Sequence, residues 1–441
     1  MTSLADTASE VPSKADMKAV WSAAIEAVRP ELLVASRLSV ERGELRIDGR
    51  PLAPPLLLDG SGRIGFGRIL VVGGGKAAAG LAAALESLLG GESAAGHRLS
   101  GLVSVPEGCG RRLRSIEVRE TRPAAANLPT ERVVECTREM LNRIASLAAT
   151  DLAIAIVTGG GSALLAAPRE GVSLDEKIAA TRRLSESGAT IAELNAVRRS
   201  MSLVKAGGLA RACSAGRLLV LVLSDVIGGD LDVIASGPCM PGDGSAADGR
   251  WTTGRGCIVE HLILGDNATA VHAAARTAGS LGYELVVREG SVASSRESAE
   301  DVGRRLAAEG LELVDAVRRD GRPRAIIEGG EAIVRVPADH GTGGRNQQTV
   351  LAAIDAATSS GPWPAGLAIA SVGTDGEDGP TDAAGGLADS SIVESIHSLG
   401  LDVRGALARC DAHPLLATSG GLIRTGPTGT NVADVRVVLA R

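Results

Sequence analysis

The sequence predicts an α/β protein in which a Rossmann-like, doubly wound domain is followed by a second α/β domain with a mixed sheet. Short apolar runs alternate with helical patterns in the first half of the chain, as in folds built from βαβ units. Hydrophobic residues make up 44% of the sequence but aromatic residues only 1%. The core must therefore consist of Ala, Val, Leu and Ile, which suit helices packed on buried parallel strands. At 441 residues, the chain also exceeds the usual size of a single core.

The strands of the first domain are expected at short, continuous apolar runs that end in glycine or a polar residue. These runs are Ile69–Val72, Leu102–Val105, Leu152–Val157 and Leu218–Leu223. Helical patterns lie between them at Lys76–Leu89, Glu131–Leu147 and Thr190–Lys205, and Thr190 with Glu193 forms a capping-box spacing. This alternation implies right-handed crossovers and one doubly wound sheet.

A stretch rich in Gly, Pro, Asp and Ser, Pro238–Gly256, interrupts the alternation and is typical of a domain boundary. We therefore predict a disordered tail over 1–13, the Rossmann-like domain over 14–240, a hinge over 241–256 and the second domain over 257–441.

In the second domain, strand patterns occur at Leu262–Leu264 and Leu367–Val372, and helical patterns at Ala268–Leu281 and Gln347–Ala357. The segments Ala325–Glu328 and Ala332–Val336, joined by Gly329-Gly330, predict a hairpin. Two further strands are expected on either side of Thr425–Asn431.

The composition excludes several classes of protein. A net charge of −6 argues against a nucleic-acid binder, which needs a basic face. No stretch approaches the ~20 apolar residues that span a bilayer, and the charged first twenty residues do not form a signal peptide. The six cysteines form no C-x-x-C pair, so free thiols, a reducing compartment and a cytoplasmic location are expected.

The first chemical motif is VVGGGKAAAG, residues 71–80, between a strand and a helix. Its glycines Gly73, Gly74 and Gly75 allow a tight turn whose N–H groups approach an anion, and Lys76 adds a point charge. The run from Gly73 to Ala78 also matches the dinucleotide pattern G-x-G-x-x-A, with Glu107 as a loose candidate for the acidic residue. A tight turn with a surface lysine is the structural alternative.

A second strand–glycine–helix turn follows in IVTGGGSALL, residues 156–165. Here Gly159, Gly160, Gly161 and the hydroxyl of Ser162 are candidates for a further anion site, although three glycines also permit close packing. Two such turns at the carboxyl ends of strands in one sheet favour a ligand site.

Polar residues then follow on one helical stripe and in the next loops. Asn195, Arg198, Ser202 and Lys205 share a stripe, which by itself equally describes a solvated face. Asp225 directly follows a buried strand, where a carboxylate needs a cation or serves as a helix cap.

The second domain holds a sharper pair of loops. GTGGRN, residues 341–346, opens a helix and offers backbone donors with the guanidinium of Arg345, which suits a carboxylate or phosphate. GTDGEDGPTD, residues 373–382, crowds Asp375, Asp378 and Asp382 into one loop, where like charges favour a bound cation. The spacing is not that of an EF-hand, and Mg²⁺ fits better; a solvated acidic turn is the alternative.

Together these motifs resemble the glycerate 2-kinase family, whose C-terminal part is the MOFRL domain. The resemblance runs from about residue 15 to the end and rests on motifs in the family's order: GGGKAAAG, TGGGSAL, ELNAVRRSMSLVK, LSDVIGGDLDVIASGP, LGDN, EGGE, GTGGRNQQ, GTDGEDGPTDAAG and TGPTGTNVAD. It departs from the family at Arg122-Pro123, where His-Pro is usual, and at Lys205-Ala206-Gly207-Gly208, which lacks one basic group.

The resemblance implies an active site in a cleft between the domains and ATP- and Mg²⁺-dependent phosphorylation of the 2-hydroxyl of D-glycerate, giving 2-phosphoglycerate and ADP. It implies Lys76 and Arg345 as essential residues, and we assign Asp375 to catalysis with them. Substrate- and nucleotide-binding residues are then expected at Gly73, Gly74, Gly75, Gly159, Gly160, Gly161, Ser162, Asn195, Arg198, Ser236, Asp266, Asn267, Glu331, Gly343, Gly344, Asn346, Thr428 and Asn431, and metal ligands at Asp225, Asp375, Asp378 and Asp382.

The expected partners are therefore glycerate and ATP, with neither nucleic acid nor membrane, and a homodimer is one option for the oligomeric state. The alternative function is an NAD(P)-dependent hydroxypyruvate reductase, because of Gly73–Ala78. That reaction gives no reason for the acidic loop, whereas a kinase needs both a metal and a phosphate clamp.

Overall fold

A computed structural model describes residues 12, 14–41, 44–52, 66–90, 98–124, 128–186, 191–228, 230–243, 245–246, 248–291 and 296–441. The chain divides into two compact units. The N-terminal unit comprises Arg29–Asp266 with Gly429–Asn431, and the C-terminal unit comprises the residues up to Val28, Asn267–Thr428 and Val432–Arg441. Apart from Pro12, the predicted tail lies outside the described residues.

The N-terminal unit is built on a seven-stranded sheet among the described residues, in the order β6-β5-β4-β7-β8-β10-β9. Its strands are β4 (Ile69–Gly74), β5 (Leu99–Pro106), β6 (Ile116–Arg122), β7 (Leu152–Thr158), β8 (Arg217–Leu223), β9 (Arg250–Thr252) and β10 (Ile258–Gly265). All neighbouring pairs are parallel except β10 and β9. The chain winds outward from β4 to β6 and then outward again from β7, so the switch point of this doubly wound sheet lies between β4 and β7.

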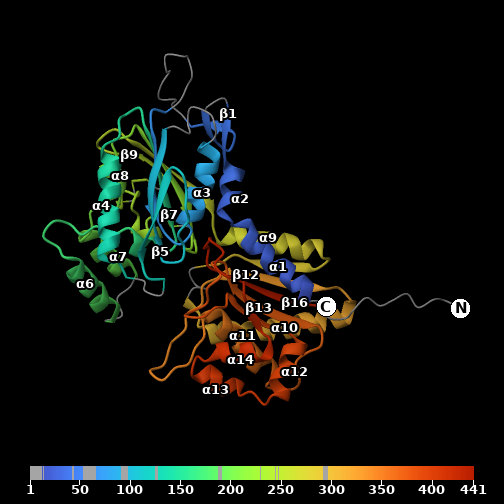
Figure 1. The fold of residues 1–441 in the computed structure, drawn as a ribbon. Helices are drawn as coiled ribbons and strands as arrows, with labels where there is room; N and C mark the ends of the chain where they lie inside the picture. The colour runs from blue at the N-terminus through green and yellow to red at the C-terminus, as the bar shows by residue number, and fades with distance from the viewer. Residues whose placement is uncertain are drawn as a thin grey trace. The chain divides into compact units, whose positions relative to one another are not determined.

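Helices cover both faces of this sheet (Figure 1), as the apolar residues on both faces of β7 and β8 require. The helices α2 (Pro30–Arg37) and α3 (Ala78–Leu89) lie on one face, and α4 (Glu131–Ala145) and α8 (Gly208–Ala212) lie on the other. The remaining elements of the unit are α5 (Gly161–Leu164), α6 (Leu174–Glu186), α7 (Ile191–Ser200), a 3-10 turn at Ile234–Ser236 and a small antiparallel sheet of β1 (Leu38–Glu41), β2 (Glu44–Ile47) and β3 (Arg50–Pro51).

The C-terminal unit contains a mixed sheet of six strands among the described residues, in the order β11-β12-β16-β13-β14-β15. These are β11 (Glu284–Arg288), β12 (Arg324–Gly330), β13 (Leu367–Gly373), β14 (Gly385–Ala388), β15 (Leu422–Ile423) and β16 (Asp434–Ala440). Only β11 and β12 pair in parallel. The last strand of the chain, β16, is central because it lies between β12 and β13.

Two helical layers enclose this second sheet (Figure 1). The helices α1 (Lys14–Ala27) and α9 (Asn267–Ser280) cover one face. The other face carries α10 (Ala299–Asp320) and α11 (Arg345–Thr358), and α12 (Ser390–Ser398), α13 (Val403–Ala408) and α14 (Ala412–Ser419) lie on the same side. No helix in the described part of the chain combines the length and the apolar character needed to cross a membrane.

The division into units differs from the predicted domain boundaries in three places. The predicted hinge contains β9, and β10 pairs with β8 in the first sheet instead of starting the second domain. Helix α1 packs against α9 and β16 in the C-terminal unit. Composition alone could not reveal this, because a surface strand and a linker both use polar residues and glycine.

The hairpin prediction at Ala325–Val336 was wrong. Strand β12 continues through Gly329 to Gly330, and its antiparallel partner is β16. The segment that follows forms no strand; Ile333 makes an isolated bridge with Ser298. Gly329 serves close packing here, since a Cβ at this position would lie 1.8 Å from Oδ1 of Asn267.

Candidate functional site

The two glycine turns lie side by side at the switch point, at the carboxyl ends of β4 and β7. Gly73 and Gly75 have φ values of 149° and 142°, in the region that favours glycine. A Cβ on Gly73 would lie 2.1 Å from the carbonyl oxygen of Ile156, and one on Gly75 would lie 2.0 Å from Oγ1 of Thr158. These glycines are therefore required by the close approach of the first turn to β7.

The first turn uses its backbone donors within the protein. The N–H of Gly75 donates to the carbonyl of Ser104, that of Lys76 to the carbonyl of Gly159 (2.9 Å), and that of Ala77 to Oγ1 of Thr158 (3.3 Å). These three N–H groups therefore do not form the anion site that the sequence predicts for this turn. The side chain of Lys76 is the cationic group that the turn presents.

Charged and polar side chains gather over Gly159 and Gly160 of the second turn. A Cβ on Gly160 would be 3.6 Å from Cγ of Lys76 and 3.7 Å from a terminal guanidinium nitrogen of Arg122. On Gly159, it would be 2.3 Å from Oδ2 of Asp225 and 2.6 Å from Nδ2 of Asn431. A Cβ on Gly159 would collide with Asp225 and Asn431, so only glycine fits there, whereas the contacts at Gly160 are ordinary van der Waals distances. The predicted residues Lys76, Asp225 and Asn431 are therefore brought together within the N-terminal unit.

Ser162 connects the second turn to the strained segment Ile234–Ser236. Its hydroxyl lies 3.0 Å from Oγ of Ser236. Ala235 and Ser236 both have positive φ values, 51° and 63°, which are uncommon for residues other than glycine and cluster at functional sites. The ammonium of Lys205 donates to the carbonyls of Ala235 (3.0 Å) and Ser162 (3.3 Å).

Part of the polar stripe predicted on α7 and the residues after it is buried. Ser202 and Lys205 lie beyond the end of the helix and are buried, with exposed fractions of 1% and 3%. Arg198 lines a cavity with Lys205 and Ser162. The side chain of Asn195 lies outside the described residues, so its role in binding stays a prediction.

Sequence reasoning missed Lys177 on α6, which lines the same cavity. The sequence pattern could have identified this residue. Lys177 lies on the inward stripe of an amphipathic helix, at helical spacing with Leu174, Ile178 and Thr181. A cation at such a position is unusual unless it has a specific role.

In the C-terminal unit, Arg345 is the first residue of α11 and is held by two carboxylates. Its Nε and one terminal nitrogen donate to Asp434 at 2.6 and 2.9 Å, a bidentate pair, and the other terminal nitrogen lies 3.0 Å from Glu331. Asp434 is fully buried, whereas the side chain of Arg345 keeps 31% of its surface exposed. The guanidinium is therefore fixed in direction and still reachable by a ligand.

Asp378 accepts hydrogen bonds at the N-terminus of α11. The backbone N–H groups of Asn346 and Gln347 donate to its two oxygens at 3.0 and 2.9 Å, and the Gln347 amide adds a third bond at 2.9 Å. Burial raises the pKa of Asp378 to about 6 and outweighs the backbone donors, which lower it. Gly344 permits this contact, because a Cβ there would lie 2.3 Å from Asp378. The predicted metal ligand Asp378 thus serves as a helix cap.

Asn346 joins this network from the interior. Only 1% of the residue is exposed; its amide donates to Asp434 (3.1 Å), and its side-chain oxygen accepts from Ser371 (2.5 Å). The position of Asn346 suits holding the loop to β13 and β16.

The other carboxylates of the acidic loop have separate environments. Asp382 is exposed and pairs with His413 (2.7 Å) and Arg424 (2.9 Å), which hold the pKa of its carboxyl below the usual value. Asp375 is half-buried two residues after the end of β13, and its Oδ1 accepts the N–H of Glu377 (3.1 Å). No group of three or more His, Cys, Asp or Glu in the described residues could hold a metal ion by itself.

A cavity of about 300 Å³ lies beside Arg345 in the same unit. Gly343 and Gly344 of the GTGGRN loop form part of its wall, together with the apolar side chains of Val334 and Val336. Its size and mostly apolar lining match those of sites for small organic ligands.

The remaining predicted residues hold the ends of strands. Asn267 is buried and donates to the carbonyls of Val432 and Asp434, both at 2.9 Å. Thr428 donates to the carbonyl of Thr374 through its hydroxyl at 2.6 Å. Asp266, half-buried, immediately precedes Asn267 at the boundary between the units.

Comparisons with known proteins agree along the chain. A family described as a domain of unknown function, DUF4147, matches residues 16–257, and the MOFRL family matches residues 324–434. A glycerate kinase from Danio rerio is 33% identical over 507 residues, covering 96% of each chain. A D-glycerate 2-kinase from Thermotoga maritima is 34% identical, covering 86% of this chain and 92% of the relative. A crystal structure of glycerate kinase from Thermotoga maritima superimposes with a TM-score of 0.78 at 32% identity, covering 98% of this chain and 100% of that one.

Proposed function

The chain belongs to the glycerate kinase family with a C-terminal MOFRL domain, and from this premise we propose that it is a glycerate 2-kinase. The reaction is transfer of the γ-phosphoryl group of ATP to the 2-hydroxyl of D-glycerate. The structural observation that supports it best is the pair of cations, Lys76 and Arg122, over Gly160 at the switch point of the N-terminal sheet. Ligands of open α/β sheets bind there, and both substrates are anions.

The proposed reaction balances simply. The 2-hydroxyl oxygen of glycerate forms a bond to the γ-phosphorus, the bond from that phosphorus to the bridging oxygen breaks, and ADP leaves. The hydroxyl proton passes to a carboxylate, for which we propose Asp375, and from there to solvent. Such a transfer needs positioning and charge neutralisation more than covalent help from the protein.

We assign charge neutralisation to Lys76 in the N-terminal unit and Arg345 in the C-terminal unit. Arg345 is pre-oriented by Asp434 and Glu331, so it does not need to be ordered when the phosphoryl group arrives. The apolar cavity beside Arg345 has the size of a site for the nucleoside.

Mg²⁺ fits the carboxylates at two positions. Asp378 and Asp382 are engaged by helix N–H groups and by His413 with Arg424, which leaves them poorly suited as ligands. Asp225 and Asp375 each follow the carboxyl end of a strand, and one or two carboxylates with phosphate oxygens and water are the usual Mg²⁺ set. We propose that Asp225 holds the ion, which would offset the negative charge of the phosphates, whereas Asp375 serves as the proton acceptor.

The reductase alternative is disfavoured by the first glycine turn. A dinucleotide site of this type needs backbone N–H groups directed at a pyrophosphate. Here the donors of Gly75, Lys76 and Ala77 go to the protein itself, and Glu107 pairs with Arg132 at 2.7 Å.

One assay separates the two functions. Purified protein with D-glycerate, ATP and Mg²⁺ should release ADP, and NMR should show phosphate on carbon 2. Hydroxypyruvate with NADH or NADPH should give no change in absorbance. Reduction of hydroxypyruvate without ADP release from the kinase mixture would refute the proposal, and a mixture without metal is the control.

We further propose a cytoplasmic location, with glycerate and ATP as the partners and no role in binding nucleic acid or membranes. The net charge of −6 supports the absence of a nucleic-acid partner. All six cysteines are free thiols, as expected in a reducing compartment. A homodimer stays an open proposal, which light scattering of the purified protein would test.

A further inference from the structure

A small cavity of the N-terminal unit collects three cationic side chains. It has a volume of about 80 Å³ and lies between the second glycine turn, α6 and the segment after α7. Lys177, Arg198 and Lys205 line it, together with the hydroxyl-bearing residues Ser162 and Thr181. None of its described lining residues is acidic.

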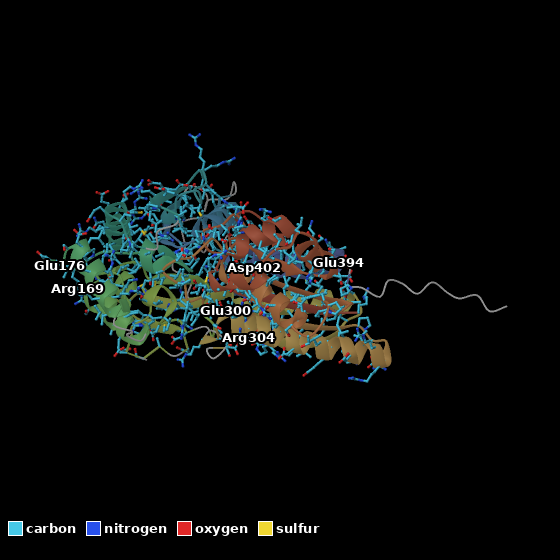
Figure 2. All side chains as sticks on the ribbon, turned by 90° about the horizontal axis from the view of Figure 1, so that it is seen from below. Arg169, Glu176, Glu300, Arg304, Glu394 and Asp402 are labelled. Atoms are coloured by element: carbon cyan, nitrogen blue, oxygen red, sulfur yellow. The ribbon has the colours of Figure 1, made fainter. Side chains whose placement is uncertain are left out.

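Lys177 is the most unusual of these residues because it is buried and no described residue bonds to its ammonium. Only 4% of the residue is exposed, and its ammonium has no hydrogen-bond partner among the residues that the structure describes. Its neighbour on α6, Glu176, points outward to solvent (Figure 2) and caps the helix start through Ser173. An ammonium that is removed from water without compensation is costly, and a bound anion would offset this cost.

The charges in the cavity also affect the pKa of Lys205. Burial lowers the pKa of Lys205 well below its ordinary value, and the charges of Lys177, Arg198 and Arg199 lower it further. The hydrogen bonds that Lys205 makes go to the uncharged oxygens of Ser162 and Ala235. No carboxylate among the described lining residues offsets the charges of Lys177 and Arg198.

The size of the cavity limits the anion. A volume of about 80 Å³ is small beside the roughly 300 Å³ or more of cavities that hold whole organic ligands. A nucleoside does not fit, but the carboxylate end of a small hydroxy acid does. The cavity also contacts Ser162, so its occupant would lie next to the turn over which Lys76 is placed.

We propose that Lys177, with Arg198 and Lys205, forms the subsite that binds the carboxylate of the small-acid substrate. This proposal rests on the proposed kinase function for the identity of the acid, but not for the existence of the subsite. It separates two tasks: the cavity recognises the carboxylate, and Lys76 and Arg345 serve the phosphoryl group. Lys177 is thus a specificity-determining residue.

The test replaces Lys177 in the full-length protein with methionine, which keeps the length of the side chain and removes its charge. The matched control is Arg182→Met, which removes one exposed charge from the same helix. For each variant, thermal unfolding checks the fold, and calorimetry measures the affinities for D-glycerate, inorganic phosphate and ATP separately. Steady-state kinetics then give KM for glycerate and for ATP.

The expected result for Lys177→Met is at least a tenfold weaker affinity and higher KM for glycerate, with the ATP values within twofold of the unchanged protein. Arg182→Met should alter neither. Unchanged glycerate affinity in a folded Lys177→Met variant would overturn the subsite, as would weaker binding of ATP or phosphate alone, which would assign the cavity to a phosphoryl group.

The two proposals fail separately. If the unchanged protein phosphorylates glycerate but Lys177→Met leaves KM for glycerate intact, the subsite is wrong and the kinase function stands. If the protein binds glycerate in a Lys177-dependent way but transfers no phosphate, the subsite stands and the function is wrong.

Discussion

Arg345 shows how a structure changes the meaning of a simple substitution. From sequence alone, Arg345→Ala is expected to lower turnover sharply without unfolding the protein. In the structure this change also removes the bidentate partner of Asp434, a fully buried carboxylate. Leaving one member of such a pair uncompensated costs about 3 kcal/mol or more. A loss of activity in Arg345→Ala would therefore have two causes, the missing guanidinium and the lower stability of the fold.

A double-mutant cycle separates the two effects. We expect Arg345→Ala to lower the free energy of unfolding by about 3 kcal/mol, and Asp434→Asn combined with Arg345→Ala to restore part of it, because the buried charge is then gone. Turnover should stay at least 100-fold reduced in both variants. Recovered turnover in the double variant would show that Arg345 only supports the fold. Urea titration and ADP release measure the two quantities.

For Lys177, in contrast to Arg345, we expect that a substitution that weakens function raises the stability of the folded protein. Burial, reinforced by the charge of Arg198, lowers the pKa of Lys177 to about 8 from 10.5. Between these values the unfolded chain holds a proton that the folded protein has lost, so stability rises with pH through this window. Below pH 8 the charged lysine costs stability on the order of 3 kcal/mol.

Without ligand, Lys177→Met should therefore be more stable than the unchanged protein at pH 7, and the difference in Tm should shrink at pH 9.5. Glycerate should raise the Tm of the unchanged protein at pH 7 and have little effect on the variant. Thermal unfolding at the two pH values measures both. A variant that is less stable at pH 7 would mean that Lys177 has a compensating partner in the folded chain.

At the scale of elements, the N-terminus of α11 depends on a residue from another loop. Gly344, the N-cap, has no side chain, and Asp378 supplies the acceptors for the N–H groups of Asn346 and Gln347. We expect Asp378→Ala to lower the free energy of unfolding by about 3 kcal/mol or more, because several buried donors lose their acceptor.

The same variant carries a pH signature. The pKa of Asp378 is raised to about 6 from 3.8, chiefly by burial. Between these values the folded protein holds a proton that the unfolded chain lacks, so this residue makes stability fall as pH rises from about 4 to about 6. Urea unfolding across this window should show a steeper fall with pH for the unchanged protein than for Asp378→Ala. Equal slopes would place the proton elsewhere.

Elements whose burial is complete were predicted well, and elements that depend on distant partners were not. Strands β4, β7 and β8 are continuous apolar runs, and buried parallel strands have this pattern regardless of context. Strand β10 was recognised as a strand, but its sheet was misassigned because the Gly- and Pro-rich stretch between β8 and β10 was interpreted as a domain boundary. The hairpin prediction failed because β12 pairs with β16, which is distant in sequence.

In the candidate site, too, local features could be predicted from the sequence, whereas contacts between distant segments could not. The glycines of both turns could be identified from sequence because their positions after strands are local. The reason for these glycines could not be predicted. Gly73 and Gly75 leave room for β7, and only the order of the strands in the sheet shows that β7 is their neighbour. The cap formed by Asp378 and the contact between Arg345 and Asp434 likewise join segments that are far apart in the sequence. Pairs of this kind carry no periodic signal.

For the whole molecule, the interleaved course of the chain decides where it can be divided. The N-terminal unit needs β10, whose residues Val259, Leu262 and Leu264 are buried, and it does not contain α1. A fragment cut at the boundary predicted from composition, 14–240, would lack β9 and β10. It would expose the edge of β8, a fully apolar strand, to pairing with other chains.

We therefore expect the fragment 29–266 to be soluble and to unfold cooperatively, and the fragment 14–240 to aggregate. Thermal unfolding followed by circular dichroism, with size-exclusion chromatography, compares the two. The longer fragment should retain the cationic cavity, since every residue that lines it lies within 29–266. Cooperative unfolding of 14–240 as a monomer would contradict the assignment of β10 to this core, because β8 would then be stable as an exposed edge.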